Sequence, residues 1–326
     1  MQNDRGRRLP FARWRIAARL AGLRACSLAG VAAATISLAT GAAAGELTSI
    51  APDAHYPEGP LWHDGTLYFA EMTRHRIAAW DGKALRTFWA HKGCGMTSIA
   101  PAPGGLFLVA CHIGRAVAWV RDSGRLASFH STGAGGEPIG NPNDAAADRR
   151  GGVYFTSSGR FSAAAAATGA IYHVVPGGRP RRVAEKIHYA NGVVVGPKGR
   201  YLYVSAHLSR TVLRYRIATD GSLTGREAWV RLDDMAAAVP GADVMAGPDG
   251  LAFGANGVLY IAEHGAGRIL AVGPDKRLRK IISVPERFVT SVEFGPNQRT
   301  LYITAPGNNV SWPHKGTVYR IREPLN

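Results

Sequence analysis

Four oxygen-bearing side chains occupy the same place in four repeated segments of this sequence. Glu58, Asn143, Asn191 and Asp249 each open a short strand-like stretch that leads into a turn. Carboxylate and carboxamide oxygens are the ligands that a hard cation such as Ca²⁺ prefers, and water completes its shell. Asn or Asp before Gly is also an ordinary turn sequence, so one such position alone would indicate only a turn. The recurrence at four equivalent positions predicts that these four side chains hold a cation.

Histidine follows the strongest strand-like stretch in three of the repeats, at His112, His207 and His264. Three histidines suggest zinc, which binds imidazole nitrogen well. They belong to different repeats, however, so we expect them to lie too far apart to share one ion. A histidine at the rim of a site is more often a hydrogen-bonding residue than a catalytic one.

The segments that carry these residues repeat six times along the chain. Each has a short strand of small residues, a turn rich in Gly, Pro, Asp or Asn, an aromatic or apolar strand, and a further strand after a polar break. The copies begin at Glu58, Thr97, Asn143, Asn191, Asp249 and Ser291. Strand-turn-strand units with a period of roughly 40 to 60 residues are typical of β-propellers. We therefore predict an all-β, six-bladed β-propeller whose four-stranded antiparallel blades surround a central channel.

In a propeller the innermost strands face the axis, so the first residues of the six copies should form one ring. Thr97 or Ser98, together with Ser291, would add hydroxyl oxygens to it. The outermost strands are weakly marked, as at 85–89 and 126–130. Two stretches do not fit the repeat, 161–168 and 235–247. We expect both to be loops over one face, or to contain a short helix.

The first 45 residues have the composition of an export signal. A front with seven Arg and one Asp precedes an apolar run that ends in three alanines at 42–44, as in secretory signal peptides. An uncleaved membrane anchor is the alternative, because the run just reaches the length of a spanning helix. We predict that residues 1–45 are removed and that 46–326 form one domain, exported to the periplasm or secreted, with no membrane span.

Charge and cysteine content add two expectations. The formal net charge is +16, but the basic residues after the leader are scattered at turns, with no aromatic residues interleaved, so nucleic acid is not an expected partner. We expect a monomer or a small homo-oligomer. After removal of the leader only Cys94 and Cys111 remain. At the same end of a predicted hairpin, they form either a disulfide or a pair of buried thiols.

Several motifs together resemble the gluconolactonase and senescence-marker-protein (regucalcin) family. They are PEGPLW, GNPNDAAADRRGGVYFTSSG, YANGVVV, GPDGLAF, LYIAEHGAGRI and TSVEFGPNQRTLYIT. The resemblance implies one divalent cation in the channel, with Ca²⁺ expected first and Zn²⁺, Mg²⁺ or Mn²⁺ as alternatives. It implies that Glu58, Asn191 and Asp249 hold the metal and that Asn143 holds metal-bound water or substrate. It also implies hydrolysis of sugar-acid lactones or related esters.

Two departures from the family bear on the substrate. Residues 155–158 read FTSS where bacterial gluconolactonases have an FTDP-like sequence, and Asn141 stands where some relatives place an Arg that grips sugar hydroxyls. Asn141 is thus a candidate substrate contact, with altered sugar specificity. The run CHIGRAV resembles a run of gluconolactonases and marks His112 as a candidate catalytic residue.

The leading hypothesis is a metal-dependent hydrolase that opens a small-molecule lactone in the channel. The cation would polarise the carbonyl, and Asp249 or His112 would accept a proton from the attacking water. A non-catalytic exported propeller that binds a ligand or protein, with a structural cation, is the alternative. A third is a metal-free relative resembling strictosidine synthase, against which the acidic pair argues, or a streptogramin lyase.

Overall fold

The computed structural model describes residues 45–309, 313–322 and 324–325. The predicted export segment, residues 1–45, lies outside the described residues except for Gly45. Among the described residues, none of the helices has the length and apolar character needed to cross a bilayer.

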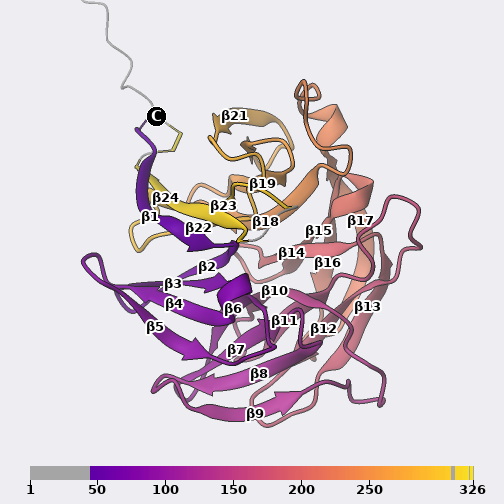
Figure 1. The fold of residues 1–326 in the computed structure, drawn as a ribbon. Helices are drawn as coiled ribbons and strands as arrows, with labels where there is room; N and C mark the ends of the chain where they lie inside the picture. The colour runs from indigo at the N-terminus through magenta and orange to yellow at the C-terminus, as the bar shows by residue number, and fades with distance from the viewer. Residues whose placement is uncertain (1–44, 310–312, 323, 326) are drawn as a thin grey trace, which may run out of the picture. The chain divides into compact units, whose positions relative to one another are not determined.

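The described chain forms six antiparallel sheets of four strands (Figure 1). The first three blades are β2 (Pro57–His63), β3 (Thr66–Glu71), β4 (Arg76–Trp80), β5 (Leu85–Ala90); β6 (Met96–Ala102), β7 (Leu106–Cys111), β8 (Ala116–Arg121), β9 (Leu126–His130); and β10 (Pro142–Ala147), β11 (Val153–Ser157), β12 (Gly169–Val174), β13 (Arg181–Ile187). The next two are β14 (Ala190–Val195), β15 (Tyr201–Ala206), β16 (Thr211–Ile217), β17 (Leu223–Arg231); and β18 (Gly247–Phe253), β19 (Leu259–His264), β20 (Arg268–Val272), β21 (Leu278–Ser283). The innermost strands contact one another in the closed cycle β2, β6, β10, β14, β18, β22 and back to β2. The predicted six-bladed propeller is confirmed.

The sixth blade joins the two ends of the described chain. Its strands are β22 (Ser291–Phe294), β23 (Thr300–Pro306), β24 (Lys315–Arg322) and, on the outside, β1 (Thr48–His55). Figure 1 shows indigo β1 beside yellow β24, and the register pairs Thr48 with Arg320. The sequence pattern does not predict β1, because its partner lies at the other end of the chain. The pairing closes the ring and covers an edge that would otherwise be exposed.

Burial explains which strands the sequence marked clearly. The second strand of each blade is covered on both faces by neighbouring blades, so β7, with the sequence LFLVAC, is apolar throughout and almost fully buried. The outermost strands β5 and β9 are largely exposed. Strands without a buried face carry no strong apolar pattern.

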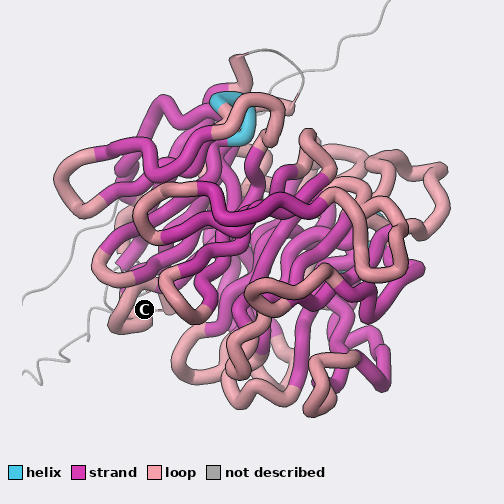
Figure 2. Tube along the Cα trace, turned by 90° about the horizontal axis from the view of Figure 1, so that it is seen from below, coloured by secondary structure: helices cyan, strands magenta, loops and turns pink. Residues whose placement is uncertain are grey.

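The two stretches outside the repeat are mainly loops, as predicted. Residues 158–168 contain turns and bends without strand or helix, and residues 235–246 follow a short 3-10 helix, η3 (Leu232–Asp234). Two further 3-10 helices, η1 (Met72–Arg74) and η2 (His207–Ser209), form the turns between the second and third strands of blades one and four. Figure 2 shows that such connections gather at the ends of the strands.

Candidate metal and active site in the central channel

The four predicted ligands converge at the start of the inner strands. Glu58, Asn143 and Asn191 are the second residues of β2, β10 and β14, and Asp249 is the third residue of β18. All four are buried. One small cavity is lined by Glu58, Asn143 and Asp249 with hydroxyl-bearing Thr97, Thr290 and Ser291, and the Asn191 side chain hydrogen-bonds Asp249. The ring inferred from the repeats is thus a physical cluster of oxygen atoms.

A β-bulge at the ring position recurs in five of the six inner strands. The pairing with the second strand shifts register between Glu58 and Leu61, and the shifts in the next four blades fall at Met96/Ser98, Pro142/Ala145, Ala190/Val193 and Pro248/Leu251. A bulge leaves one residue outside the regular ladder and redirects its side chain. The repeated irregularity therefore offers a local reason why these polar side chains turn toward the axis.

Glycines after the ring residues allow adjacent inner strands to approach. A Cβ added at Gly192 would lie 2.0 Å from the main-chain oxygen of Asp249, and one at Gly250 would lie 2.0 Å from Ser291 Oγ. In the sequence alone, Asn-Gly and Asp-Gly are also plain turn signals. Here both glycines lie within strands, where close backbone packing requires them.

The charges in the ring are costly without a counter-ion. Burial, followed by repulsion from Asp249 and Asp144, raises the pKa of Glu58 well above its usual range. Burial and repulsion from Asp144 do the same to the pKa of Asp249. The Oδ1 atom of Asn191 is also buried and has no hydrogen-bond partner. Two desolvated carboxylates beside an unpartnered carboxamide oxygen fit a hard cation.

Asp144, the residue after Asn143, is a further carboxylate of the cavity that the repeat pattern does not mark. Its carboxylate accepts hydrogen bonds from the main-chain nitrogens of Ala145 (2.9 Å) and Val193 (2.8 Å), and so links blades three and four. Burial raises the pKa of Asp144 to about 6. The PND motif contains this residue. The sequence does not show, however, whether a carboxylate next to a predicted ligand points toward the channel or away from it.

Two tyrosines beside the ring were also missed. Tyr56 and Tyr189 precede Glu58 and Asn191 by two residues, and both have positive φ (51° and 61°). Burial first, and then nearby carboxylates of the ring, raise the pKa of both hydroxyls. The same residue type at the same offset in two repeats was the available signal.

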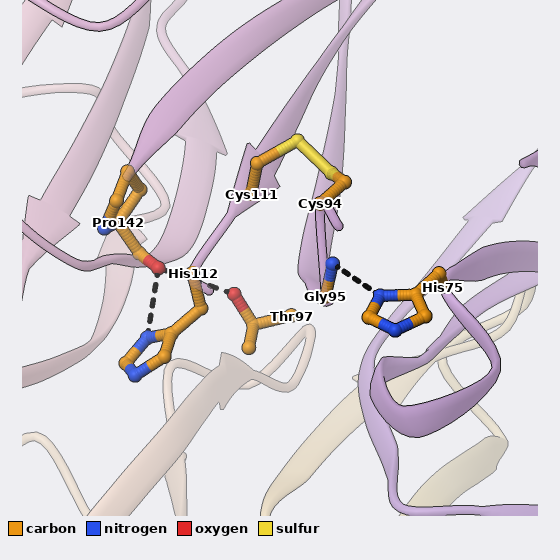
Figure 3. Close-up of a disulfide and its surroundings, with 7 residues drawn as sticks. All are labelled: His75, Cys94, Gly95, Thr97, Cys111, His112 and Pro142. Carbon is orange, nitrogen blue, oxygen red and sulfur yellow. Dashed lines mark hydrogen bonds between the residues drawn. A yellow bond between two sulfur atoms is a disulfide. The ribbon is translucent and has the colours of Figure 1, made fainter. Parts of the chain in front are cut away.

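The imidazole of His112 faces the carbonyl oxygen of Pro142, the residue before the predicted ligand Asn143 (Figure 3). Its Nδ1 is 3.0 Å from the carbonyl oxygen of Pro142. Because a carbonyl can only accept, Nδ1 carries the proton and Nε2 keeps its lone pair. Burial lowers the pKa of His112, which favours the neutral ring. Asn141, the candidate substrate contact, donates from Nδ2 to the His112 carbonyl oxygen at 3.1 Å.

A disulfide lies directly behind His112. Cys94 and Cys111 are bonded with a Cα–Cα distance of 4.5 Å, and Figure 3 shows the bridge next to His112. Of the two sequence-based readings, the disulfide is the one found. The His112 main-chain nitrogen donates to the Gly95 carbonyl oxygen at 3.0 Å. The bridge and this hydrogen bond hold the same turn.

The other rim histidines form a separate pair. The ring centroids of His207 and His264 are 5.5 Å apart. Among the described residues no three His, Cys, Asp or Glu side chains form a group that could hold a metal. His207 Nδ1 lies 3.2 Å from Asn191 Nδ2, so this histidine instead orients a predicted ligand. Burial lowers the pKa of His207 to about 4 and that of His264 to about 3.

Comparisons with known proteins give the family. Residues 56–306 match the model of the "SMP-30/Gluconolactonase/LRE-like region". A 6-deoxy-6-sulfogluconolactonase of Pseudomonas putida is 31% identical over 151 residues, which are 44% of this chain and about half (49%) of that relative's length. A gluconolactonase structure from Xanthomonas campestris superposes with a TM-score of 0.70 at 19% identity, over 86% of this chain and 90% of that one. The calcium-binding protein regucalcin from Agrobacterium tumefaciens superposes with a TM-score of 0.67 at 19% identity, over 82% and 90%.

At such identities the two structures support the fold, whereas the family match covers most of the sequence and includes every predicted ring residue. The chain belongs to the SMP-30/gluconolactonase/LRE-like family.

Proposed function

We propose that this protein is a cation-dependent hydrolase that opens a lactone in the central channel. The observation that carries the proposal is the convergence of two buried carboxylates, Glu58 and Asp249, with the unpartnered Oδ1 of Asn191. The names of the relatives, a sulfogluconolactonase and a gluconolactonase, support the reaction class. The name of the regucalcin structure supports calcium as the first ion to test.

Glu58, Asn191 and Asp249 would hold the cation, and Ca²⁺ suits an all-oxygen set. When bound, the cation would supply polarisation of the lactone carbonyl. Asn143, which lines the same cavity and carries no charge, would position water or substrate. Asn141 would position His112, because its side chain hydrogen-bonds the His112 carbonyl oxygen.

Two groups are candidates for the proton acceptor. Asp249 lies in the ring itself, and its raised pKa favours proton uptake. His112 offers an Nε2 lone pair, since its Nδ1 proton is used by Pro142. A general base must reach the proton that it abstracts and retain a free lone pair. If Asp249 binds the cation, His112 is the better placed of the two.

We also propose that the mature chain is exported. A disulfide persists in oxidising compartments and is rare in reducing ones. The Cys94–Cys111 bridge therefore agrees with the export signal predicted from residues 1–45.

The test is lactone hydrolysis by the purified protein with and without chelator, beside its metal content by mass spectrometry. Chelation should abolish turnover, and added Ca²⁺ should restore it. Asp249→Asn should lower metal content and abolish turnover, because it removes a charged ligand and a candidate base. Asp64→Asn removes the same charge from an exposed turn and should change neither. Full activity and full metal content in Asp249→Asn would overturn the proposal.

The same experiment separates the alternative. A non-catalytic propeller with a structural cation would retain its metal after purification and lose stability on chelation, yet would open none of the lactones. That combination would favour a ligand-binding or protein-binding role for the exported domain.

A further inference from the structure

The loop at 158–168 places one aromatic ring next to the candidate site. The ring centroid of Phe161 lies 4.8 Å from that of Tyr189, 5.4 Å from that of His207 and 6.3 Å from that of His264. His264 in turn packs on Phe288 at 5.1 Å. These five residues are called the aromatic wall: Phe161, Tyr189, His207, His264 and Phe288.

The aromatic wall is directly connected to the ring. Tyr189 precedes the predicted ligand Asn191 by two residues on the same backbone, and His207 Nδ1 lies 3.2 Å from the Asn191 amide nitrogen. The centroids of Tyr189 and His207 are 5.7 Å apart. The aromatic wall therefore lies next to the ring on the side of Asn191.

Phe161 differs from the rest of its loop. Residues 162–168 are Ser, Ala and Thr only. Phe161, in contrast, contacts three rings and yet remains 36% exposed. His207 and His264 beneath it are 1% and 6% exposed. A large aromatic side chain held in place while partly open to solvent provides a flat surface on which another flat group can stack.

Most hydrogen-bonding atoms of the wall are already engaged. His207 Nε2 lies 2.8 Å from the Met245 carbonyl oxygen, and His264 Nε2 lies 3.1 Å from Asn309 Nδ2. His264 Nδ1 is buried without a partner. The hydroxyl groups of a polyhydroxylated lactone would lose their hydrogen bonds to water when they pack against these ring faces. Each hydroxyl left unpaired would lower the affinity about tenfold. An aryl or alkyl group loses no hydrogen bonds there.

We propose that Phe161 and the aromatic wall select lactones with an aryl or alkyl group over polyhydroxylated sugar lactones. The inference rests on the lactone hydrolysis proposed above and names Phe161 as a specificity-determining residue. Its hydrocarbon edge and face would stack on the group attached to the lactone ring, while the carbonyl would face the cation that Glu58 and Asp249 would hold.

The test compares kcat/KM for dihydrocoumarin, an aryl lactone, with that for D-glucono-1,5-lactone. We expect the unmodified protein to favour dihydrocoumarin by at least about tenfold. Phe161→Ala should reduce kcat/KM for dihydrocoumarin about tenfold, which corresponds to the loss of roughly one to two aromatic contacts. The value for the sugar lactone should change by less than about threefold. Phe129 is an exposed aromatic residue on β9, and Phe129→Ala should leave kcat/KM unchanged for both substrates.

Three results would overturn the inference: a preference for the sugar lactone that Phe161→Ala leaves unchanged, an equal fall for both substrates, or equal effects of Phe161→Ala and Phe129→Ala. If no lactone is opened, the proposed function fails, but the wall is still tested. 3,4-Dihydro-2(1H)-quinolinone is the lactam counterpart of dihydrocoumarin and can be titrated by calorimetry. Binding that Phe161→Ala weakens about tenfold would support the wall without hydrolysis, and binding that does not depend on Phe161 would overturn it.

Discussion

Removal of the Cys94–Cys111 disulfide should destabilise the propeller measurably while leaving its chemistry nearly intact. The double variant Cys94→Ala/Cys111→Ala removes a bridge between residues separated by 17 positions. Closing a loop of this length lowers the entropy of the unfolded chain, which stabilises the folded state by about 3 kcal/mol. For a domain of this size, 1 kcal/mol shifts Tm by about 2 °C, so we expect Tm to fall by about 6 °C.

The activity should respond less, because other contacts hold His112. Its Nδ1 donates to the Pro142 carbonyl oxygen, and its main-chain nitrogen donates to the Gly95 carbonyl oxygen. Neither contact involves a sulfur atom. Below the unfolding transition we expect kcat for lactone hydrolysis to remain within about threefold of the unmodified protein, which is under 1 kcal/mol in the barrier.

The assay is thermal unfolding of chain 45–326 in its oxidised form, its reduced form and the double variant. A thiol count under denaturing conditions provides the control, since the oxidised protein should show no free thiol. Reduction and the double variant should shift Tm equally. A shift below about 1 °C would refute the entropic estimate. A loss of activity above about tenfold at unchanged stability would show that the bridge itself positions His112.

Four further predictions concern the site and the leader. Asn143→Ala should keep near-normal metal content and lower turnover, because the amide carries no charge; loss of the metal would make it a ligand. His112→Ala should abolish turnover with the metal retained, whereas full activity would return the role of base to Asp249. Burial holds the pKa of His264 near 3, so folded His264 stays neutral while the unfolded form takes up a proton below pH 6.5. Between pH 7 and about 4.5 the unmodified protein should therefore lose about 3 kcal/mol more stability than His264→Gln in urea unfolding; equal losses would contradict this. Intact mass of the exported protein should place its first residue near Gly45, and a chain that starts at Met1 would contradict that prediction.

The repeat can be recognised in the sequence because this fold restricts the residue type at two kinds of position. The second strands, such as β7, are covered on both faces and must be apolar. The ring residues Glu58, Asn191 and Asp249 precede glycines that only close strand packing requires. Local constraints of this kind appear directly in residue type and spacing. The number of blades, the antiparallel hairpins and the oxygen ring follow from them.

Other features depend on contacts between distant segments, which no local pattern encodes. The pairing of β1 with β24 joins residues about 270 positions apart, and neither strand identifies its partner. Asp144 joins the site only because its carboxylate reaches the backbone of the next blade at Val193. Phe161 meets His207 and His264 only because its loop returns over two blades. Residue type and spacing identified the four predicted ligands Glu58, Asn143, Asn191 and Asp249. Packing between blades added Asp144 and the two tyrosines to the site and set the directions and tautomers of the side chains, because these depend on backbones brought together only when the ring closes.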